Sequence, residues 1–528
     1  MPSPSNIAST STSSTASPLD ALHGSASRQP AANLKIALAT GDGIGPEIMN
    51  ATLDLFQAAG VQDAAPGGVE FIPVEMGASV FARGNTKGMT DEAIKTVEDC
   101  GVLFKGPMET PKGGGGKSIN VTARKLWNAY ANFRTFKTLP GVETVYSKAG
   151  IHIDMSVVRE NIEDTYGGVE HRLSNDMIQC KRLISAPGCD DVHRFAFHTA
   201  KKLGIKKVHC GHKANIMKMT DGMFLDRFKA AAKDFPEIET GDVIVDALCM
   251  NLVVKPTIYQ MIVLPNLQGD IVSDLCAGLV GGLGFAPSAN IGRHISIFEA
   301  VHGTAPDIAG KGIANPTSLV LSGIMMLRHI NLGYNAAVIE NALLATLESG
   351  IHTGDFGSKT TPPVGTREFT KAIIDRLGQT PKTVPAVSVP EKSTPLLQRP
   401  AKPGGQQVIR TFKNMVTAVV GCDIYLDSPL SPAALSEEMT RVCEESPFRL
   451  TLISNRGTQV WPTGSVYTEC VDYYRVRFEL RDGVSAGSIG QSRTVALMDK
   501  IAEKFTVCSY ELLRTFDGVK GFTLAQGQ

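Results

Sequence analysis

The stretch that decides the fold class is LKIALATGDGIGPEIMNATLDLF, residues 34–56. Residues 34–39 are a short, mostly apolar run, which predicts a buried strand. The glycines of GDGIG predict a tight turn, and the apolar side chains that follow recur at the three- and four-residue spacing of a helix. The glycine pattern is not G-x-G-x-x-G, so this unit of strand, turn and helix does not predict a Rossmann fold.

Similar units follow along the chain. Strand-like runs lie at residues 157–158, 208–210 and 262–264, and helix-like runs at 215–235, 270–282 and 317–330. Their alternation predicts an α/β architecture with a sheet covered on both faces. Residues 168–185 interrupt this alternation and predict two short antiparallel strands around a polar turn.

Both ends of the chain differ in composition from its middle. Residues 1–32 are rich in Ser, Thr, Ala and Pro, so we expect a disordered tail. A transit peptide is the other interpretation of this tail, although Arg28 is its only arginine. Residues 381–405 are proline-rich and predict a linker. The order of strand, helix, two strands and helix in residues 406–528 predicts a small α+β domain.

The overall composition excludes several classes of protein. The chain has 528 residues, 43% of them hydrophobic, with 52 basic and 52 acidic side chains, which predicts a globular protein of several domains. No charge excess favours nucleic acid or a membrane surface as a partner, and no run reaches the ~18 apolar residues of a membrane span. None of the ten cysteines forms a C-x-x-C pair, so we expect reduced thiols and no cysteine zinc site.

The segment NLQGDIVSDL holds two carboxylates four residues apart. Asp270 and Asp274 would open a helix and share one face, where two like charges cost ~0.2–0.5 kcal/mol unless they are neutralised. A divalent cation with oxygen ligands, Mg²⁺ or Mn²⁺, would neutralise them, and Asp246 is a possible third ligand. The alternative is that Asp270 only favours the helix N-terminus and Asp274 is solvated.

The segment GGGGKSINVTARKLWNAYANFR carries small polar side chains and arginines close together. They are Ser118, Asn120, Arg124 and Arg134, and Arg159 follows further along the chain. Guanidinium groups pair with carboxylates through two hydrogen bonds, so the cluster suits a ligand with several carboxylates. Spacing alone leaves open whether these arginines are ordinary surface residues.

Several motifs together resemble the isocitrate and isopropylmalate dehydrogenase family. They are GDGIGPE, KGPMETP, SINVTAR, YANFR, VVRENIEDTYGG, HKANIMK, NLQGDIVSDL, GGLGFAPSANIG and EAVHGTAPDIAGKGIANP, spread over residues 35–380. The resemblance implies that family's non-Rossmann α/β fold. It has a large cofactor-binding domain (33–130 and 281–380) and a small dimerisation domain (131–280) with a clasp near 168–187. The domain at 406–528 resembles an extension of one subgroup, and we expect it to serve assembly or regulation.

The resemblance also implies a reaction and a role for each candidate residue. The reaction is NAD-dependent oxidative decarboxylation of isocitrate to 2-oxoglutarate and carbon dioxide in the tricarboxylic acid cycle, with Mg²⁺ or Mn²⁺. Ser118 and Asn120 would contact the carboxylate that distinguishes isocitrate, and Arg124, Arg134 and Arg159 the other carboxylates. Asp246, Asp270 and Asp274 would bind the metal, and Tyr166 and Lys213 would be the acid–base pair. Lys213 and Asp246 would act in the site of a partner subunit, which implies a homodimer.

The cofactor residues implied by the resemblance are Thr110, His302, Gly303, Thr304, Ala305, Asp307, Ile308 and Asn315. Family members that prefer NADP carry Lys-Tyr where this chain has Asp307 and Ile308. A carboxylate accepts hydrogen bonds from free ribose hydroxyls but repels a 2′-phosphate, so we expect NAD, with NADP as the alternative. Lys311, four residues further on, would offset part of that repulsion.

Two other functions remain to be weighed. Relatives that act on isopropylmalate or homoisocitrate lack the Ser-x-Asn-Val-x-x-Arg pattern, which is intact from Ser118 to Arg124. A non-catalytic regulatory subunit would have lost metal or acid–base residues, and none is missing. The expected location is the cytoplasm for a bacterial protein, or the mitochondrial matrix for a eukaryotic one.

Overall fold

The computed structural model describes residues 33–65, 67–109, 118–392, 415–465 and 467–523, with the backbone of strands 28–30 and 396–398. The chain divides into two compact units. Unit 1 comprises residues 1–166 and 183–407, and unit 2 comprises residues 167–182 and 408–528. Most of the predicted N-terminal tail lies outside the described residues. Its strand β1 (Arg28–Pro30) pairs with β14 (Leu396–Gln398).

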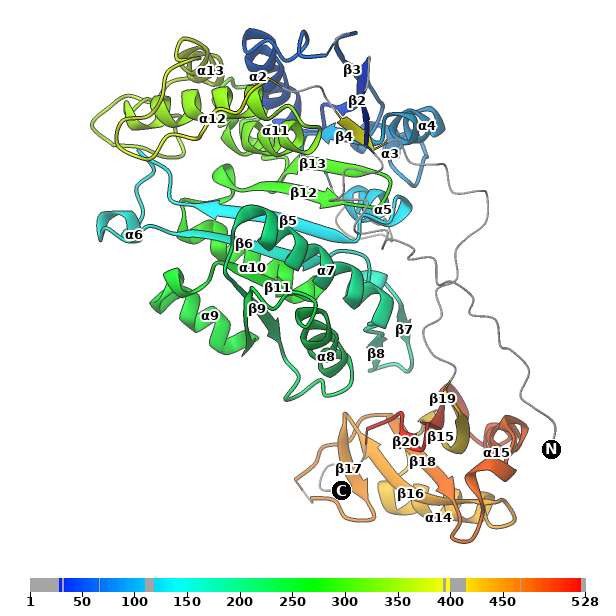
Figure 1. Cartoon of the computed structure of the whole chain (residues 1–528). Coiled ribbons are helices and arrows are strands. Elements are labelled where there is room, and N and C mark those ends of the chain that lie inside the picture. Colours follow the sequence, from blue (N-terminus) through cyan, green and yellow to red (C-terminus); the bar gives the residue numbers. More distant parts are fainter. Residues whose placement is uncertain are drawn as a thin grey trace, which may run out of the picture. The chain divides into compact units, whose positions relative to one another are not determined.

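The described strands of unit 1 form one ten-stranded sheet in the order β10-β9-β11-β6-β5-β12-β13-β4-β2-β3 (Figure 1). Its strands are β2 (Leu34–Ala39), β3 (Val69–Pro73), β4 (Val102–Lys105), β5 (Ala131–Lys137), β6 (Asp154–Glu160), β9 (Lys207–His212), β10 (Glu239–Ile244), β11 (Met261–Leu264), β12 (Pro287–Ile291) and β13 (Ser296–Ala300). Two parallel blocks meet at the central strands β5 and β12, which pair antiparallel with each other and with their outer neighbours. The α/β class is confirmed, and the change of direction at β5 and β12 creates the kind of switch point where ligands bind.

Helices pack on both faces of this sheet. The helices of unit 1 are α2 (Gly45–Ala58), α3 (Ala78–Ala82), α4 (Asp91–Cys100), α5 (Ile119–Leu126), α6 (Val145–Lys148), α7 (Ala186–Leu203), α8 (Thr220–Ala232), α9 (Val245–Val254), α10 (Asn266–Leu279), α11 (Thr317–His329), α12 (Gly333–Glu348) and α13 (Thr366–Ile374). Side chains alternate along a strand. Val157 of β6 therefore packs in the cluster that contains α10, whereas Val158 packs in the cluster that contains α7.

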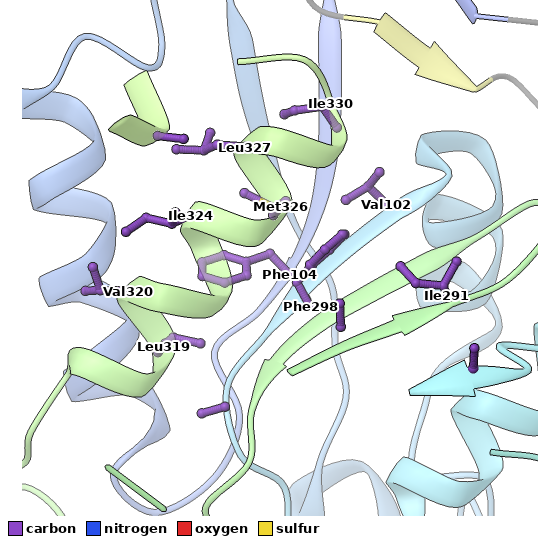
Figure 2. Packing of buried hydrophobic residues seen from close by; sticks show 14 of the residues in the cluster. Val102, Phe104, Ile291, Phe298, Leu319, Val320, Ile324, Met326, Leu327 and Ile330 are labelled. Atoms are coloured by element: carbon purple, nitrogen blue, oxygen red, sulfur yellow. The ribbon is translucent and has the colours of Figure 1, made fainter. Parts of the chain in front are cut away.

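Helix α11 shows how the core is filled. Figure 2 shows its apolar side chains, such as Ile324 and Leu327, beside Phe104 of β4 and Phe298 of β13. All four are at most 2% exposed. Burying a side chain of this size contributes ~1.5–3 kcal/mol, so this packing fixes β4 and β13 under the candidate site.

The predicted strand, glycine turn and helix at residues 34–56 form β2 and α2. Gly43 has a left-handed φ of 59°, and a Cβ there would lie 2.1 Å from the carbonyl oxygen of Thr304. The amide of Ile44 donates to that same oxygen at 2.9 Å. The glycine turn therefore holds the segment around Thr304, because only glycine permits so close an approach.

Unit 2 contains a domain whose elements run β-α-β-β-β-α-β-β, which is the β-α-β-β-α-β order of a ferredoxin-like fold with two added short strands, β17 and β20. Its elements are β15 (Thr417–Asp427), α14 (Pro432–Val442), β16 (Phe448–Asn455), β17 (Thr458–Trp461), β18 (Tyr473–Leu480), α15 (Gln491–Ala502), β19 (Thr506–Phe516) and β20 (Val519–Lys520). The described strands of this domain pair in the order β17-β16-β18-β15-β19-β20. The separate C-terminal α+β domain is confirmed, although β17, β19 and β20 were not predicted.

The two short strands predicted within residues 168–185 are β7 (Glu170–Arg172) and β8 (Ile178–Cys180), an antiparallel pair. The structure groups this hairpin with the C-terminal domain in unit 2. The division of unit 1 into a large and a small domain stays a prediction, because both would share the one sheet.

The predicted linker, residues 381–405, is described only in part. Its first residues pack along α12. There the Asn341 side chain donates to and accepts from the backbone of Val387, and the Glu348 carboxylate accepts from the amides of Lys382 and Thr383. Residues 393–395 and 399–405 lie outside the described residues. Within the part of the chain that is described, no helix has the length and apolar character needed to cross a membrane.

His193 of α7 gives a testable consequence of core packing. Its ring is fully buried against Phe224 and Phe228, and neither nitrogen has a hydrogen-bond partner among the described residues. Burial lowers the pKa of His193 from 6.5 to about 3. As the pH falls below about 6.5, His193 therefore binds a proton in the unfolded chain but not in the folded protein. Stability should therefore fall below about pH 6.5, by at most about 1.4 kcal/mol per pH unit.

The His193→Phe variant should lose this part of the pH dependence when denaturant unfolding is followed between pH 5 and 7. His171→Phe, which changes an exposed histidine of β7, is the matched control and should leave the slope unchanged. An unchanged slope in His193→Phe would show that His193 does not contribute to acid sensitivity.

Candidate active site

The three predicted substrate arginines come from different elements and converge at the switch point of the sheet. Arg134 lies on β5, Arg159 lies near the end of β6, and Arg124 lies in the last turn of α5. Their side chains are 5%, 1% and 11% exposed. They are therefore not ordinary surface arginines, because buried guanidinium groups require partners.

Arg159 is held mainly by helix α10. Its Nε and Nη2 donate to Oδ1 of Asn266 at 3.0 and 2.7 Å, and its Nη1 binds the Asp270 carboxylate. A Cβ on Gly269 would lie 2.6 Å from Cγ of Arg159, so glycine is required where the arginine crosses the helix. Burial and the nearby Arg124 lower the pKa of Arg159.

Arg134 reaches the same helix from the neighbouring strand. Its Nη1 donates to Ser273 Oγ at 2.7 Å and to Asp274 Oδ1 at 3.3 Å, and its Nε donates to Asn132 Oδ1 at 2.8 Å. Its Nη2 lies 3.7 Å from Asp270 Oδ1. Burial, together with the neighbouring arginines, lowers the pKa of Arg134 to about 10, which still leaves it charged at neutral pH.

Arg124 belongs to a buried ionic network that sequence reasoning missed. Its Nη2 binds Glu299 Oε1 at 2.8 Å, and Lys105 Nζ lies 2.5 Å from Glu299 Oε2. Burial alone would raise the pKa of Glu299, but Lys105 and Arg124 hold it far below its ordinary value. Both Lys105 and Glu299 stand in the motifs quoted above, KGPMETP and EAVHGTAP, but only the fold shows that they meet.

A cavity of about 170 Å³ opens beside this network, lined by Asn120, Arg124, Arg134, Ser288, Glu299 and His302 among others. Asn120 Oδ1 and Arg124 Nε are buried and have no hydrogen-bond partner within the described residues. Ser118 is the N-cap residue of α5, two positions before Asn120. Unpaired polar atoms facing a cavity are costly unless a ligand satisfies them, so the cavity favours a polar ligand.

Tyr166 lies against two of these groups. Its hydroxyl donates to Asp270 Oδ2 at 2.5 Å, and the guanidinium carbon of Arg159 lies 4.9 Å from the centre of its ring. Burial raises the pKa of Tyr166, and the hydrogen bond to Asp270 raises it further. The tyrosine therefore keeps its proton at neutral pH and can serve as a proton donor.

The predicted metal residues fall into two groups. Asp270 and Asp274 both lie on α10 and face Arg134 of β5. Asp246, at the start of α9, pairs with Lys213 instead. The prediction that Asp270 opens the helix is wrong, because α10 begins at Asn266 after Pro265 and Asp270 lies in its second turn. Among the described residues, no three histidine, cysteine or acidic side chains come close enough to hold a metal ion.

The two carboxylates of α10 differ in charge environment. Burial opposes ionisation of both. At Asp270, Arg159 and the Tyr166 hydroxyl outweigh burial and lower the pKa. At Asp274, burial prevails and the pKa is raised. The oxygen donors suit a hard divalent cation, which would compete with Arg134 and Arg159 for the same carboxylates.

The predicted cofactor residues lie on one anchored segment, residues 302–315. Ala305 has a left-handed φ of 40°, and the 3₁₀ turn Pro306–Ile308 follows it and leaves Asp307 exposed. Asn315 donates to Asp355 Oδ2 at 3.0 Å, and the Glu47 carboxylate accepts from the amides of Gly312 and Ala314. The segment thus brings together His302, Gly303, Thr304, Ala305, Asp307, Ile308 and Asn315, while Thr110 lies outside the described residues.

Residues 35–373 match the family model for isocitrate/isopropylmalate dehydrogenase. Residues 417–528 match the model for the bacterial isocitrate dehydrogenase C-terminal domain. The chain belongs to the isocitrate/isopropylmalate dehydrogenase family. The predicted resemblance is thereby confirmed, including the subgroup with a C-terminal extension.

Relatives in this family carry both cofactor names. The chain is 44% identical to isocitrate dehydrogenase [NADP] of Thermus thermophilus, over 93% of this chain and 96% of that protein. The Rickettsia felis enzyme of the same name is 38% identical, over 93% of this chain and 99% of that protein. Isocitrate dehydrogenase [NAD] catalytic subunit 5 of Arabidopsis thaliana is 44% identical over 64% of this chain and 87% of that protein. Names alone therefore leave the cofactor undecided.

Solved structures support the family fold. The Thermus thermophilus protein TT0538 has a TM-score of 0.83 at 43% identity, covering 94% of this chain and 96% of that one. Isocitrate dehydrogenase from Methylococcus capsulatus has a TM-score of 0.61 at 41% identity, covering 66% of this chain and all of that one. The 66% of this chain that the second structure covers is close in length to residues 35–373, which match the family model.

Proposed function

We propose that this chain is an NAD-dependent isocitrate dehydrogenase that converts isocitrate to 2-oxoglutarate and carbon dioxide with Mg²⁺ or Mn²⁺. The observation that carries the proposal is the convergence of three buried arginines, Arg124, Arg134 and Arg159, with the Asp270–Tyr166 pair. Buried guanidinium groups beside a polar cavity suit a small molecule with several carboxylates.

Isocitrate is favoured over its relatives by the polar side of the cavity. Isopropylmalate would place an isopropyl group where isocitrate has a carboxylate. Arg124 and Asn120 line this cavity, and the buried Arg124 Nε has no hydrogen-bond partner within the described residues; Ser118, two positions before Asn120, is the N-cap residue of α5. An apolar substituent would leave the buried Nε–H of Arg124 without a hydrogen-bond partner, which costs binding energy, whereas a carboxylate can accept from it and from the amide NH₂ of Asn120.

The residues present fit the two groups that the reaction requires. Asp270 and Asp274 supply oxygen donors for the divalent cation, and the segment 302–315 offers a rigid wall for the dinucleotide. When bound, the metal supplies Lewis-acid polarisation of the substrate hydroxyl and the nicotinamide accepts the hydride.

The protein's own residues bind the substrate and move its protons. The arginines fix the carboxylates and so orient the hydroxyl-bearing carbon. Lys213 takes the hydroxyl proton, either as a neutral amine or through its neighbours. Tyr166 donates a proton to the carbon left by decarboxylation, a role that its retained hydroxyl proton permits.

The site is shared between two subunits in this proposal. Lys213 and Asp246 pair with each other, while Asp270 and Tyr166 form a separate contact. Helices α9 and α10 pack together and expose large apolar side chains, each more than half exposed: Met250, Val253, Val254 and Ile271. An apolar surface beside Asp246 and Asp270 favours a homodimer that brings Lys213 and Asp246 to the partner's Asp270 and Asp274.

Asp307 and Ile308 support NAD as the cofactor. Asp307 is exposed on the 3₁₀ turn that follows the strained Ala305, and the turn is held through Thr304 and Glu47. A carboxylate fixed there accepts from the ribose hydroxyls and repels a 2′-phosphate of nearly two negative charges. NADP is the second candidate, because the two bacterial relatives that span 93% of this chain are named for it.

Steady-state kinetics with isocitrate, Mn²⁺ and each nicotinamide, followed by the absorbance of the reduced cofactor, test both parts of the proposal. We expect a higher kcat/KM with NAD. The double variant Asp307→Lys, Ile308→Tyr should lower kcat/KM for NAD and raise it for NADP, because a cation and a hydroxyl would replace the repelling carboxylate. A higher kcat/KM of the unmodified enzyme with NADP would refute the cofactor assignment, and turnover of isopropylmalate instead of isocitrate would refute the substrate.

A further inference from the structure

The hairpin β7–β8 joins the candidate site to the C-terminal domain by chain connectivity. The chain leaves unit 1 directly after Tyr166, forms the hairpin within unit 2, and re-enters unit 1 at Leu183. Each of its strands has only three residues, and Ile178 is 58% exposed. A two-stranded hairpin this short is marginal by itself, so its order depends on what it packs against.

Two side-chain contacts attach the hairpin to the C-terminal domain. Ser174, which is 8% exposed at the hairpin turn, donates from Oγ to Asp472 Oδ1 at 2.6 Å. Lys181, just after β8, donates from Nζ to Glu511 Oε1 of β19 at 2.8 Å. The carboxylates of Asp472 and Glu511 therefore hold the hairpin at its turn and at its base.

The base of the hairpin is attached just as firmly on the side of unit 1. The fully buried Asp164 donates its amide to the carbonyl oxygen of Leu183 at 2.9 Å, which closes the loop at its base. Its Oδ2 accepts from the amide of Leu267 at 3.1 Å, in the first turn of the helix that carries Asp270. Next to it, Glu163 accepts from the amide of Ser185 at 2.7 Å, at the start of α7.

We propose that the C-terminal domain regulates turnover through this hairpin, by setting the position of Tyr166 relative to Asp270. Tyr166 is the residue between the Asp164 anchor and the hairpin, so its backbone is constrained from both sides. When Ser174 and Lys181 release their carboxylates, the constraint on the C-terminal side of Tyr166 weakens and rests on the contact between Lys125 Nζ and the Tyr166 carbonyl oxygen at 2.5 Å. Asp164 is then the positioning residue that transmits the change to α10.

The test uses the full chain with the double variant Ser174→Ala, Lys181→Met, which breaks both contacts. Hydrogen exchange at the amides of Asp164 and Thr165 should become faster, because the Asp164–Leu183 closure loosens. The proposal rests on the acid role of Tyr166, so kcat should fall by about 2- to 30-fold, a usual range for coupling through a structure. The KM for isocitrate should change less than kcat, because the hairpin itself touches none of the three arginines and only Arg159 lies against Tyr166.

Two further proteins make the result decisive. Lys201→Met is the control. It breaks the Lys201–Glu237 pair, which has the same 2.8 Å length and involves no residue of the hairpin, and it should change neither the hydrogen exchange at Asp164 and Thr165 nor kcat. The charge exchange Lys181→Glu, Glu511→Lys should restore part of the turnover that Lys181→Met loses. The proposal is overturned if the hairpin amides exchange faster while those of Asp164 and Thr165 do not. The proposal is also overturned if exchange at Asp164 rises but kcat does not respond; Tyr166→Phe then shows separately whether Tyr166 is the acid.

Discussion

Tyr166→Phe and Lys213→Met are each expected to lower overall turnover by ~10²–10⁴-fold, the usual contribution of a general acid or base. The two variants should fail at different steps. The Tyr166 hydroxyl donates to Asp270, and in the proposed mechanism it is needed only when the carbon left by decarboxylation is protonated. Lys213 pairs with Asp246, and in the proposed mechanism it takes the hydroxyl proton, whose loss accompanies hydride transfer.

These steps can be separated with the 3-keto acid that precedes decarboxylation. Tyr166→Phe should still reduce this acid with reduced nicotinamide, whereas Lys213→Met should not. Tyr467→Phe is the control, because this tyrosine is 91% exposed in the C-terminal domain and is not among the residues of the proposed site or dimer surface. Equal losses in both half-reactions would contradict this division of roles.

Asp270→Asn is expected to weaken Mn²⁺ binding and turnover at limiting metal by far more than it lowers the melting temperature. The variant loses a negative ligand, and even outer-shell losses at metal sites cost ~10- to 100-fold. Its amide oxygen can still accept from Arg159 while its amide NH₂ donates to the hydroxyl oxygen of Tyr166, which limits the damage to the fold. Mn²⁺ binding is measured directly by electron paramagnetic resonance. Asp226→Asn, an exposed carboxylate of α8, is the control.

The same variant tests the shared site. Lys213→Met and Asp270→Asn are each nearly inactive, but a hybrid of the two contains one intact site if Lys213 acts in the partner subunit. Unfolding and refolding an equal mixture should therefore recover activity that neither parent shows. No recovery in a mixture that forms dimers would place Lys213 and Asp270 of one chain in one site. Near-normal activity of Asp270→Asn at limiting Mg²⁺ would show that α10 is not the metal site.

Local pattern predicted several elements of unit 1, those whose apolar periodicity is strong. The predicted strands at 157–158, 208–210 and 262–264 lie inside β6, β9 and β11, and the helix at 317–330 matches α11 within one residue. The predicted start at Asp270 was four residues late. In α10, Gly269 resembles a breaker in the sequence, yet it lies inside the helix because Arg159 packs across it.

The sequence predicted only those site residues to which the family motifs assign a role. The Lys105–Glu299–Arg124 network was missed because Arg124 and Glu299 are 175 residues apart and no local pattern marks a buried ion pair. In the C-terminal domain, β19 was missed because its pairing with β15 contains two register shifts. Such irregularities break the alternation of apolar and polar residues by which strands are predicted.

The crowding of positive charge at the sheet's switch point links the stability of the free protein to its affinity for anions. The cations are Lys105, Arg124, Arg134 and Arg159, and the carboxylates that face them are Glu299, Asp270 and Asp274. The lowered pKa values of Arg134 and Arg159 show that their charges are held at a cost. A tricarboxylate bound as proposed would bring further negative charge to these cations, so part of its affinity would come from reducing their mutual repulsion. A substitution that adds a carboxylate beside these cations would therefore stabilise the free protein but weaken the proposed binding of substrate.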